Sequence, residues 1–262
     1  MTKKRQTTVN SIKKLVTKPI AHRGLHDEKN GIIENSFSAF ANAINAGYFI
    51  ECDLQLTKDN QAIVFHDDSL ERLCEQQGNI ADIGLAEAKN ITLKNSTNKD
   101  KIQSFAQMLE QVNGQVAIFV ELKVQQGERN ILLAKVAVEA LQNYQGDVAI
   151  ISFSPIILRA VKEFGFQSPT GIVVEKFTSD SAKAKLSWLK RFYLRHMLHF
   201  FTSKFDFIDA DHKALDLPII KFLQKLGFFT VCWTIKSQNQ ADIALKKCDQ
   251  ICFEGFTPKE KP

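Results

Sequence analysis

Eight residues of the kinds that bind ligands or move protons stand at or near the ends of short apolar segments of this 262-residue chain. They are His22, Arg23, Glu51, Asp53, His66, Glu121, Lys123 and Trp233. Taken singly, each has an ordinary explanation, such as a structural histidine, a solvated strand face or a surface ion pair. That explanation weakens for the whole set, because charged residues at the ends of buried strands have no solvent-facing side to occupy.

The three carboxylates indicate a bound cation. Glu51 and Asp53 are two residues apart, so on a strand they share one face, and Glu121 stands near the end of another apolar segment. Carboxylates that converge raise one another's pKa unless a positive charge lies among them. Ligands that are all oxygen favour a hard ion, so we predict one divalent metal ion, Mg²⁺ or Ca²⁺.

The histidines and the basic residues point to chemistry at a phosphoryl group. His22 and His66 can act as general acid and general base near neutral pH. Arg23 and Lys123 are cationic donors suited to phosphate oxygens. A metal ion, two histidines and two cations together predict cleavage of a phosphodiester better than any other common reaction.

Eight short apolar segments can serve as the strands that position these residues: 19–21, 48–54, 116–122, 148–153, 171–174, 205–210, 229–233 and 250–253. The segment 116–122 contains a run that is apolar on both faces, which is typical of a parallel strand covered by helices. Amphipathic segments such as 130–143 and 155–164 separate most of the strands. The alternation predicts an α/β fold, a (β/α)8 TIM barrel, whose reactive groups collect at the C-terminal ends of the strands. We expect residues 1–262 to form one barrel domain, with the catalytic barrel over 19–258.

One extra strand interrupts this alternation. The segment 62–66 follows the second barrel strand too closely for a crossover helix. Asp59 and Asn60 are good turn residues, so we predict a β-hairpin over 51–66 in the loop after strand 2. A two-residue turn at Asp59-Asn60 would place Asp53 directly opposite His66.

Composition and cysteine usage are those of an intracellular globular protein. The net charge of +5 is mild, and we expect no nucleic-acid partner. The first twenty residues carry six Lys or Arg and lack the apolar stretch of a signal peptide, and no segment approaches the length of a spanning helix. The five cysteines show no metal-ligand spacing, so we expect a reducing compartment and a cytoplasmic protein.

A basic, aromatic segment at 176–204 is predicted as an insertion between barrel strands 5 and 6. It contains seven Lys or Arg and one Asp, a local net charge of 7 − 1 = +6. As a helix, 183–204 resembles an interfacial segment that would contact the inner membrane surface. Alternatively, its apolar side covers the barrel or a partner subunit, and we favour this second interpretation.

The same residues carry a family resemblance over about residues 19–258. The motifs are His22-Arg23-Gly24, Glu34-Asn35-Ser36 with Phe40, Glu51-x-Asp53, Thr57-x-Asp59, His66-Asp67, Glu121-Leu122-Lys123, Ser152-Phe153 and Trp233-Thr234. In this order the chain resembles the glycerophosphodiester phosphodiesterases, a group of phospholipase C-like phosphodiesterase barrels. Two features depart from the family pattern: Lys236 stands where Asn is common, and 250–255 replaces a Gly-Ile-Ile-Thr-Asp-x-Pro-like strand.

The resemblance implies roles for the eight residues. Glu51, Asp53 and Glu121 would bind the metal, and His22 and His66 would transfer protons in an order that is left open. Arg23 and Lys123 would contact the phosphate, and Trp233 would line the pocket for the alcohol. The implied activity is hydrolysis of glycerophosphodiesters to glycerol 3-phosphate and an alcohol.

Two other functions remain as alternatives. One is a phospholipase D-like activity on lysophospholipids or sphingolipids, with the basic segment as the membrane contact. The other is a non-catalytic phosphodiester-binding domain, which the intact set of histidines and carboxylates disfavours. Three further residues have open roles: Asn35 as a helix cap or a brace for the site, and His26 and His212 as loop residues or substrate neighbours.

Overall fold

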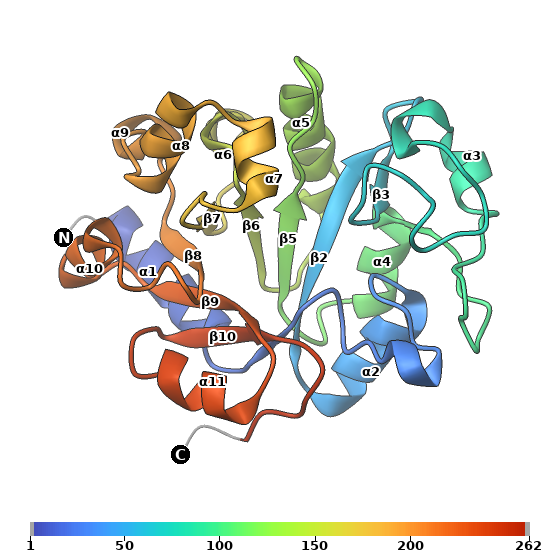
Figure 1. The fold of residues 1–262 in the computed structure, drawn as a ribbon, viewed down its shortest axis with the longest axis horizontal. Coiled ribbons are helices and arrows are strands. Elements are labelled where there is room, and N and C mark those ends of the chain that lie inside the picture. The colour runs from blue at the N-terminus through green and yellow to red at the C-terminus, as the bar shows by residue number, and fades with distance from the viewer. Residues whose placement is uncertain (1–2, 260–262) are drawn as a thin grey trace.

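The computed structural model describes residues 3–259, and eight of its strands close into a parallel barrel (Figure 1). The barrel strands are β1 (Ile20–Ala21), β2 (Phe49–Leu56), β5 (Ile118–Leu122), β6 (Val148–Ser152), β7 (Thr170–Val174), β8 (Phe207–Asp211), β9 (Thr230–Ile235) and β10 (Gln250–Phe253). Strand β1 pairs with β10 on one side and with β2 on the other, which closes the ring. The predicted (β/α)8 barrel and its eight strands are confirmed.

Helices follow most strands and cover the outside of the barrel. They are α2 (Phe37–Ala46), α4 (Phe105–Val112), α5 (Arg129–Leu141), α6 (Pro155–Glu163), α10 (Pro218–Lys225) and α11 (Gln238–Ala244), with a short α3 (Leu85–Ala88) and 3-10 turns η1 (Glu28–Asn30) and η2 (Ile80–Asp82). Local sequence sets their starts. Ser36 accepts from the backbone N–H of Ala39, Ser104 forms a capping box with Gln107, and proline occupies the first turn of α6 and α10.

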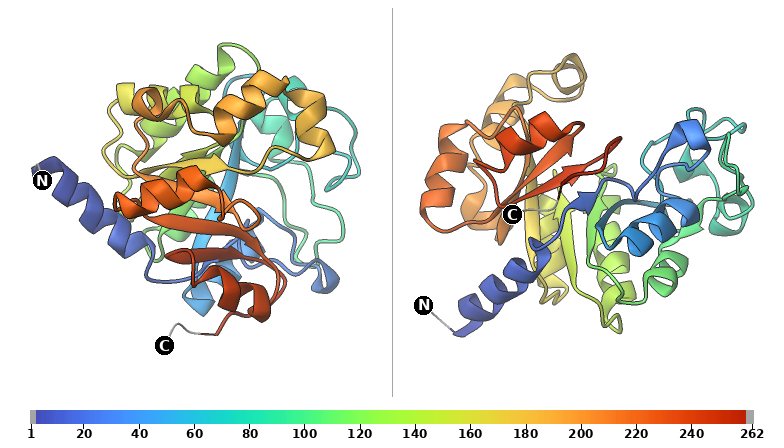
Figure 2. Two further views of the ribbon diagram at one scale, coloured as in Figure 1. Left: turned by 60° about the vertical axis from the view of Figure 1, so that its left-hand side comes forward. Right: turned by 90° about the horizontal axis from the view of Figure 1, so that it is seen from below.

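Two layers of apolar side chains hold the barrel together. One lies between the strands and the outer helices and includes Cys52. The other fills the barrel, where Phe119 and Phe207 meet edge to face with their centroids 6.0 Å apart. Helix α1 (Lys3–Leu15) adds Ile12 and Leu15 to this inner layer, and Figure 2 shows it projecting from the body of the protein. Because α1 precedes β1, it closes the N-terminal end of the barrel.

The hairpin after strand 2 exists, but its predicted register is wrong by one residue. Strand β3 (Ala62–Val64) pairs antiparallel with β2, with Leu54 opposite Val64, and β4 (Gln103–Ser104) extends the pair. The turn has three residues, and Asn60 has a positive φ of 59°, while Thr57 donates its backbone N–H to the carbonyl of Gln61 at 3.0 Å. The Asp53 carbonyl therefore accepts from the N–H of Phe65, and His66 follows the paired region.

The basic segment 176–204 lies between β7 and β8, as predicted for the insertion. It folds as three short helices rather than as one: α7 (Asp180–Lys185), α8 (Trp188–Arg195) and α9 (Phe200–Ser203). Ser179 and Ser187 cap the first two, and Leu186 between them is extended, so the segment breaks there. Within residues 3–259 no helix is long and apolar enough to cross a membrane.

Candidate active site

A cavity of about 180 Å³ opens at the C-terminal end of the barrel strands. Seven of the eight predicted residues line it: His22, Arg23, Glu51, His66, Glu121, Lys123 and Trp233. The eighth, Asp53, is 1% exposed and contacts two of the lining residues, Arg23 and Lys123. The structure thus brings together all eight residues, which come from six different elements or loops of the chain.

The three predicted carboxylates form one cluster. Asp53 on β2 is the register neighbour of Glu121 on β5, and Glu51 lies two residues earlier on β2. One ligand oxygen from each of the three lies within 4.8 Å of the others. Glu51 is 4% exposed, and its Oε1 has no hydrogen-bond partner. A buried carboxylate oxygen without a partner is costly, so this oxygen fits a cation that would complete the site.

Burial and charge push the pKa values of the cluster apart. Burial raises the pKa of Glu51 well above its ordinary value, and the neighbouring Asp53 and Glu121 raise it further. Burial would also raise the pKa of Asp53, but the cations of Lys123 and Arg23 outweigh it and hold that pKa below its ordinary value. A divalent ion would relieve the repulsion between Glu51 and the two neighbouring carboxylates.

Arg23 and Lys123 balance part of the negative charge. Lys123 Nζ lies 2.9 Å from Glu121 Oε1 and 3.3 Å from Asp53 Oδ1. Arg23 Nε lies 3.3 Å from Asp53 Oδ2, and its backbone N–H donates to Glu51 Oε2 at 2.9 Å. The chain turns sharply here, with a φ of 55° at Arg23 and 80° at Gly24. A Cβ at Gly24 would lie 2.9 Å from atoms of the following helix, so only glycine fits.

Asn35 braces the cluster, which decides between its two predicted roles. Its Nδ2 donates to Asp53 Oδ2 at 2.8 Å, and its Oδ1 accepts from the Asp53 backbone N–H at 3.3 Å. The helix cap is the next residue, Ser36. Asn35 therefore fixes both the side chain and the backbone of Asp53.

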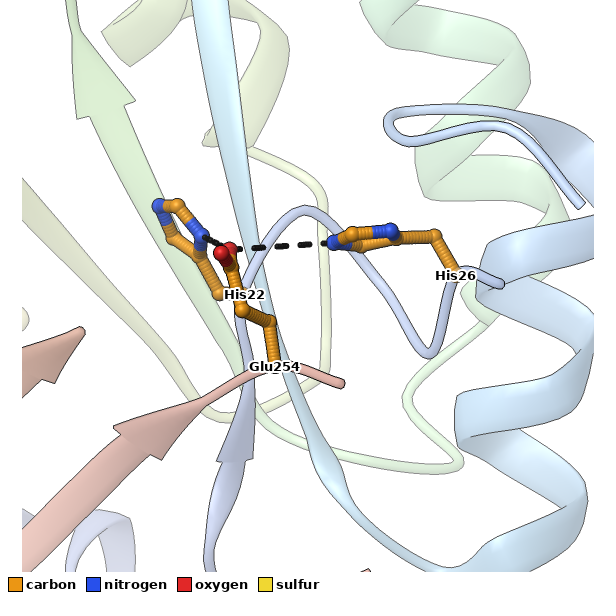
Figure 3. A group of neighbouring side chains, drawn as sticks. All are labelled: His22, His26 and Glu254. Atoms are coloured by element: carbon orange, nitrogen blue, oxygen red, sulfur yellow. Dashed lines mark hydrogen bonds and ion pairs between the residues drawn. The ribbon is translucent and has the colours of Figure 1, made fainter. Parts of the chain in front are cut away.

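His22 is held by Glu254, which directly follows the last barrel strand (Figure 3). Its Nδ1 lies 2.5 Å from Glu254 Oε2, while its Nε2 faces Glu51 Oε2 at 4.0 Å. Figure 3 shows His26 on the other side of the same carboxylate, with Nε2 3.8 Å from Glu254 Oε2. The neighbouring His22, His26 and Lys236 depress the pKa of Glu254, whereas burial lowers the pKa of His22 against the effect of that carboxylate.

His66 is held by a second acidic residue, Asp67. Its Nδ1 lies 2.6 Å from Asp67 Oδ1, and Arg72 donates to the other oxygen of Asp67 at 2.5 Å. Arg72 also donates to Glu34 Oε1 at 2.7 Å, and Arg23 donates to that same oxygen at 2.7 Å. Glu34 and Arg72 thus connect the surroundings of His66 with those of Arg23.

The remaining wall of the cavity is mainly apolar. Phe153 and Trp233 line it and meet edge to face with centroids 5.7 Å apart. The backbone carbonyl of Asp209 accepts from Trp233 Nε1 at 3.2 Å, which fixes the indole. The polar and apolar walls together suit a ligand with an anionic centre and a less polar substituent.

Comparison with known proteins identifies the family of this chain. The model of the glycerophosphoryl diester phosphodiesterase family matches residues 22–251. The chain belongs to this family. YhdW of Bacillus subtilis is 25% identical over 231 residues, which are 85% of this chain and 87% of YhdW. A glycerophosphodiester phosphodiesterase of Caldanaerobacter subterraneus is 31% identical over 167 residues, covering 60% of this chain and 66% of that enzyme.

A solved structure shows the same fold. It is a phosphodiesterase of Oleispira antarctica in complex with the product sn-glycerol-3-phosphate. The TM-score is 0.74 at 20% sequence identity, over 90% of this chain and 91% of that one. The resemblance to the glycerophosphodiester phosphodiesterases is therefore confirmed in the family and in the barrel.

The two departures from the family pattern contact each other. Lys236 Nζ lies 2.6 Å from Glu254 Oε1, and Glu254 stands in the segment 250–255, which differs from the family's closing motif. Sequence reasoning recorded both positions but missed that they form one unit behind His22. The two departures from the family pattern were themselves the signal. One adds the base Lys236 and the other adds the acid Glu254, and two such residues can balance each other's charge.

Sequence reasoning also missed Arg72 and Asp209. Arg72 lies in a loop with no periodic pattern to mark it. Asp209 lies on β8, lines the cavity, and is 5% exposed, yet its Oδ1 has no hydrogen-bond partner. Burial raises the pKa of Asp209 well above its ordinary value, and Glu121 adds to this effect. The sequence pointed instead to His212, which lies beside Asp211 and is absent from the cavity lining.

Proposed function

We propose that this chain catalyses the metal-dependent hydrolysis of glycerophosphodiesters to glycerol 3-phosphate and an alcohol. The observation that carries this proposal is the cavity in which three carboxylates, two histidines and two cations meet in a member of this family. The product bound to the related Oleispira enzyme supports the choice of substrate.

Glu51, Asp53 and Glu121 would hold one divalent ion, Mg²⁺ or Ca²⁺. Their fit rests on the proximity of their oxygens and on the unpartnered Oε1 of Glu51. A bound ion of this kind stabilises the charge that develops on a phosphoryl group. Lys123 and Arg23 lie on the same wall, and we assign them to hydrogen bonds with phosphate oxygens.

His22 and His66 are the proton-transfer groups of this proposal. In each ring Nδ1 is taken by a carboxylate, Glu254 for His22 and Asp67 for His66. Each Nε2 is thereby left for the reaction. One histidine removes the proton of the attacking hydroxyl, and the other protonates the leaving alcohol. The Phe153 and Trp233 wall would receive that alcohol.

The proposal is tested by incubating the purified chain with glycerophosphocholine and measuring glycerol 3-phosphate. Release should need Mg²⁺ or Ca²⁺ and stop in chelator, and a Glu51→Gln variant should be inactive under all conditions. Absence of hydrolysis with any divalent ion, over several glycerophosphodiesters, would overturn it and favour a binding domain.

A lysophospholipid is a second candidate substrate. The observation that favours it is the exposed apolar face of helix α8, which lies at the same end of the barrel as the cavity. Comparing kcat/KM for lysophosphatidylcholine and glycerophosphocholine decides between the two. A ratio above one would make the cleavage of lysophospholipids the principal activity.

A further inference from the structure

Helix α8 presents an apolar face to solvent. Trp188, Leu189, Phe192 and Tyr193 are spaced so that they share one helical face, and they are between 40% and 67% exposed. The opposite face contains Leu194, which is buried. On an ordinary surface helix the apolar face would point inward. Leu198 at 58% and Phe201 at 87% exposure continue the exposed set toward α9.

For these six side chains, the exposure contradicts the interpretation that the apolar side covers the barrel. Leu194 and Met197 of the same segment are buried, and Phe177 and Phe205, both 5% exposed, anchor it as well. Helix α8, which Ser187 caps, holds four of the exposed side chains in place. Patches of large apolar side chains on a soluble protein mark a contact surface.

The positive charge around the exposed face of α8 indicates which kind of partner it binds. Lys183, Lys185, Lys190 and Lys204 are exposed in the same segment. The segment carries +6, from seven Lys or Arg and Asp180. A second copy would bring the same positive charge to the contact, which disfavours a symmetric dimer. An anionic lipid surface satisfies both features, because its headgroups attract the lysines and its acyl region accepts the aromatic side chains.

The position of the face relates it to the cavity. The segment begins where β7 ends, so it lies at the C-terminal end of the barrel, toward which the arrows of β2 and β5 point in Figure 1. Phe177 packs on Phe153 with centroids 6.4 Å apart, and Phe153 lines the cavity. A single aromatic ring, that of Phe153, thus lies between Phe177 at the start of the segment and Trp233.

We propose that α8 and α9 form a membrane-binding face that docks the protein on anionic lipid beside the mouth of the cavity. Docking there would bring the cavity to the surface from which phosphodiesters of lipid origin are released. This membrane-binding proposal does not depend on the proposed reaction, since lipid binding is measured without substrate.

The test is sedimentation of the full chain with vesicles of phosphatidylcholine alone or with phosphatidylglycerol added. Binding should require phosphatidylglycerol and should weaken as salt is added. Each lysine removed from the face should lower the affinity by about fivefold. Trp188→Ser with Phe192→Ser should abolish binding and leave the melting temperature unchanged. A large fall in melting temperature would show that these side chains are structural and overturn the proposal.

A matched control lies at the other end of the barrel. Lys13 and Lys14 are exposed on α1, so Lys13→Ser with Lys14→Ser removes the same charge as Lys183→Ser with Lys190→Ser. Only the second pair should weaken binding by more than tenfold. Equal loss in both pairs would mean that total charge, not this face, binds lipid. A concentration-dependent dimer that is lost in Trp188→Ser, without vesicle binding, would assign the face to a second copy.

A separate observation concerns Asp209, the buried carboxylate on the cavity wall without a partner for its Oδ1. It is absent from the cluster formed by Glu51, Asp53 and Glu121. A buried polar atom that faces a ligand cavity is commonly satisfied by the ligand. The groups of a glycerophosphodiester that can donate to it are its hydroxyls.

We infer that Asp209 is a specificity residue that accepts a hydrogen bond from a hydroxyl of the substrate. This inference rests on the proposed function. Its test compares glycerophosphocholine with bis(4-nitrophenyl) phosphate, a phosphodiester without hydroxyls. Asp209→Leu should lower kcat/KM for the first by 10- to 100-fold and for the second by less than about threefold. Asp209→Asn, which keeps an acceptor, should recover most of the loss.

The outcomes separate this inference from the proposed function. If the wild-type chain cleaves no glycerophosphodiester, the proposed function fails. If it does, and Asp209→Leu loses equally on both substrates or binds the metal more weakly, hydroxyl recognition is wrong. A thermal melt of each variant shows that the comparison is made on folded protein.

Discussion

The two ends of the barrel are built from the same strands but contain opposite kinds of side chain. At the N-terminal end Ile12 and Leu15 of α1 cover an interior of aromatic and aliphatic residues. At the C-terminal end the strands finish in carboxylates and cations that are buried and partly unpaired. The first arrangement stabilises the fold. The second costs stability and is explained by binding, so changes at the two ends should have separate effects.

The largest effect is expected from the metal cluster. Glu51→Gln removes a proposed ligand and should lower turnover by at least about 10³-fold, because charge stabilisation by an ion is worth several kcal/mol. The fold should remain, since one of three mutually repelling carboxylates is neutralised. Turnover and a thermal melt are measured on the same sample. Full activity of Glu51→Gln in chelator would remove the metal from the reaction.

The histidines come next. His22→Ala and His66→Ala should each lower kcat by about 10²- to 10⁴-fold, the usual range for general acid–base catalysis. The double variant should lose less than the product of the two, because both act on one transition state. His212→Ala is the matched control, since His212 does not line the cavity, and it should keep normal turnover.

Glu254→Gln should have a smaller effect at the same end. It keeps a hydrogen-bond acceptor near His22 Nδ1 but removes the charge that also holds Lys236. We expect a loss of about 10- to 100-fold in kcat, as for residues that orient a catalytic group. If Glu254 merely stabilises the fold, kcat below the melting temperature will be unchanged.

A substitution at the N-terminal end of the barrel should lower stability and leave the kinetics unchanged. Leu15 is 2% exposed under the barrel, so Leu15→Ala should lower the free energy of unfolding by about 2–5 kcal/mol. Its kcat and KM at a temperature where it is folded should match those of the wild type. Altered kinetics in this variant would mean that the two ends are coupled.

The smallest effect links pH to metal binding. The pKa of Glu51 is raised above its ordinary 4.5, so the folded protein holds this proton more tightly than the unfolded chain. Without metal, that contribution to stability is present below about pH 4.5 and is lost as pH rises through the folded-state pKa. The ion replaces the proton. The rise in melting temperature on adding Mg²⁺ or Ca²⁺ should therefore grow by a few degrees between about pH 5 and pH 8. A rise independent of pH would argue against Glu51 as a ligand.

Periodicity and motif spacing were enough to predict the strands and the side chains that gather at their ends. Both depend on local pattern. Alternation within a strand decides which side chains share a face, and the C-terminal ends of parallel barrel strands lie at the same end of the barrel. The hairpin register was wrong because a third turn residue, held by the positive φ of Asn60, shifts every pair by one. The pairing of His22 with Glu254 spans 232 positions, and no local pattern reports a contact of that separation.

Strand β1 closes the barrel by pairing with both the last strand, β10, and the second barrel strand, β2. It is two residues long. Its residues Ile20 and Ala21 pair with Phe49 and Ile50 on one side and with Cys252 and Phe253 on the other. His22 follows immediately and donates its backbone N–H to the carbonyl of Phe253. The proposed catalytic histidine therefore stands at the shortest joint of the ring. Parting those strands would separate β10, and the adjacent Glu254, from the carboxylates on β2, so the site is complete only when the ring is closed.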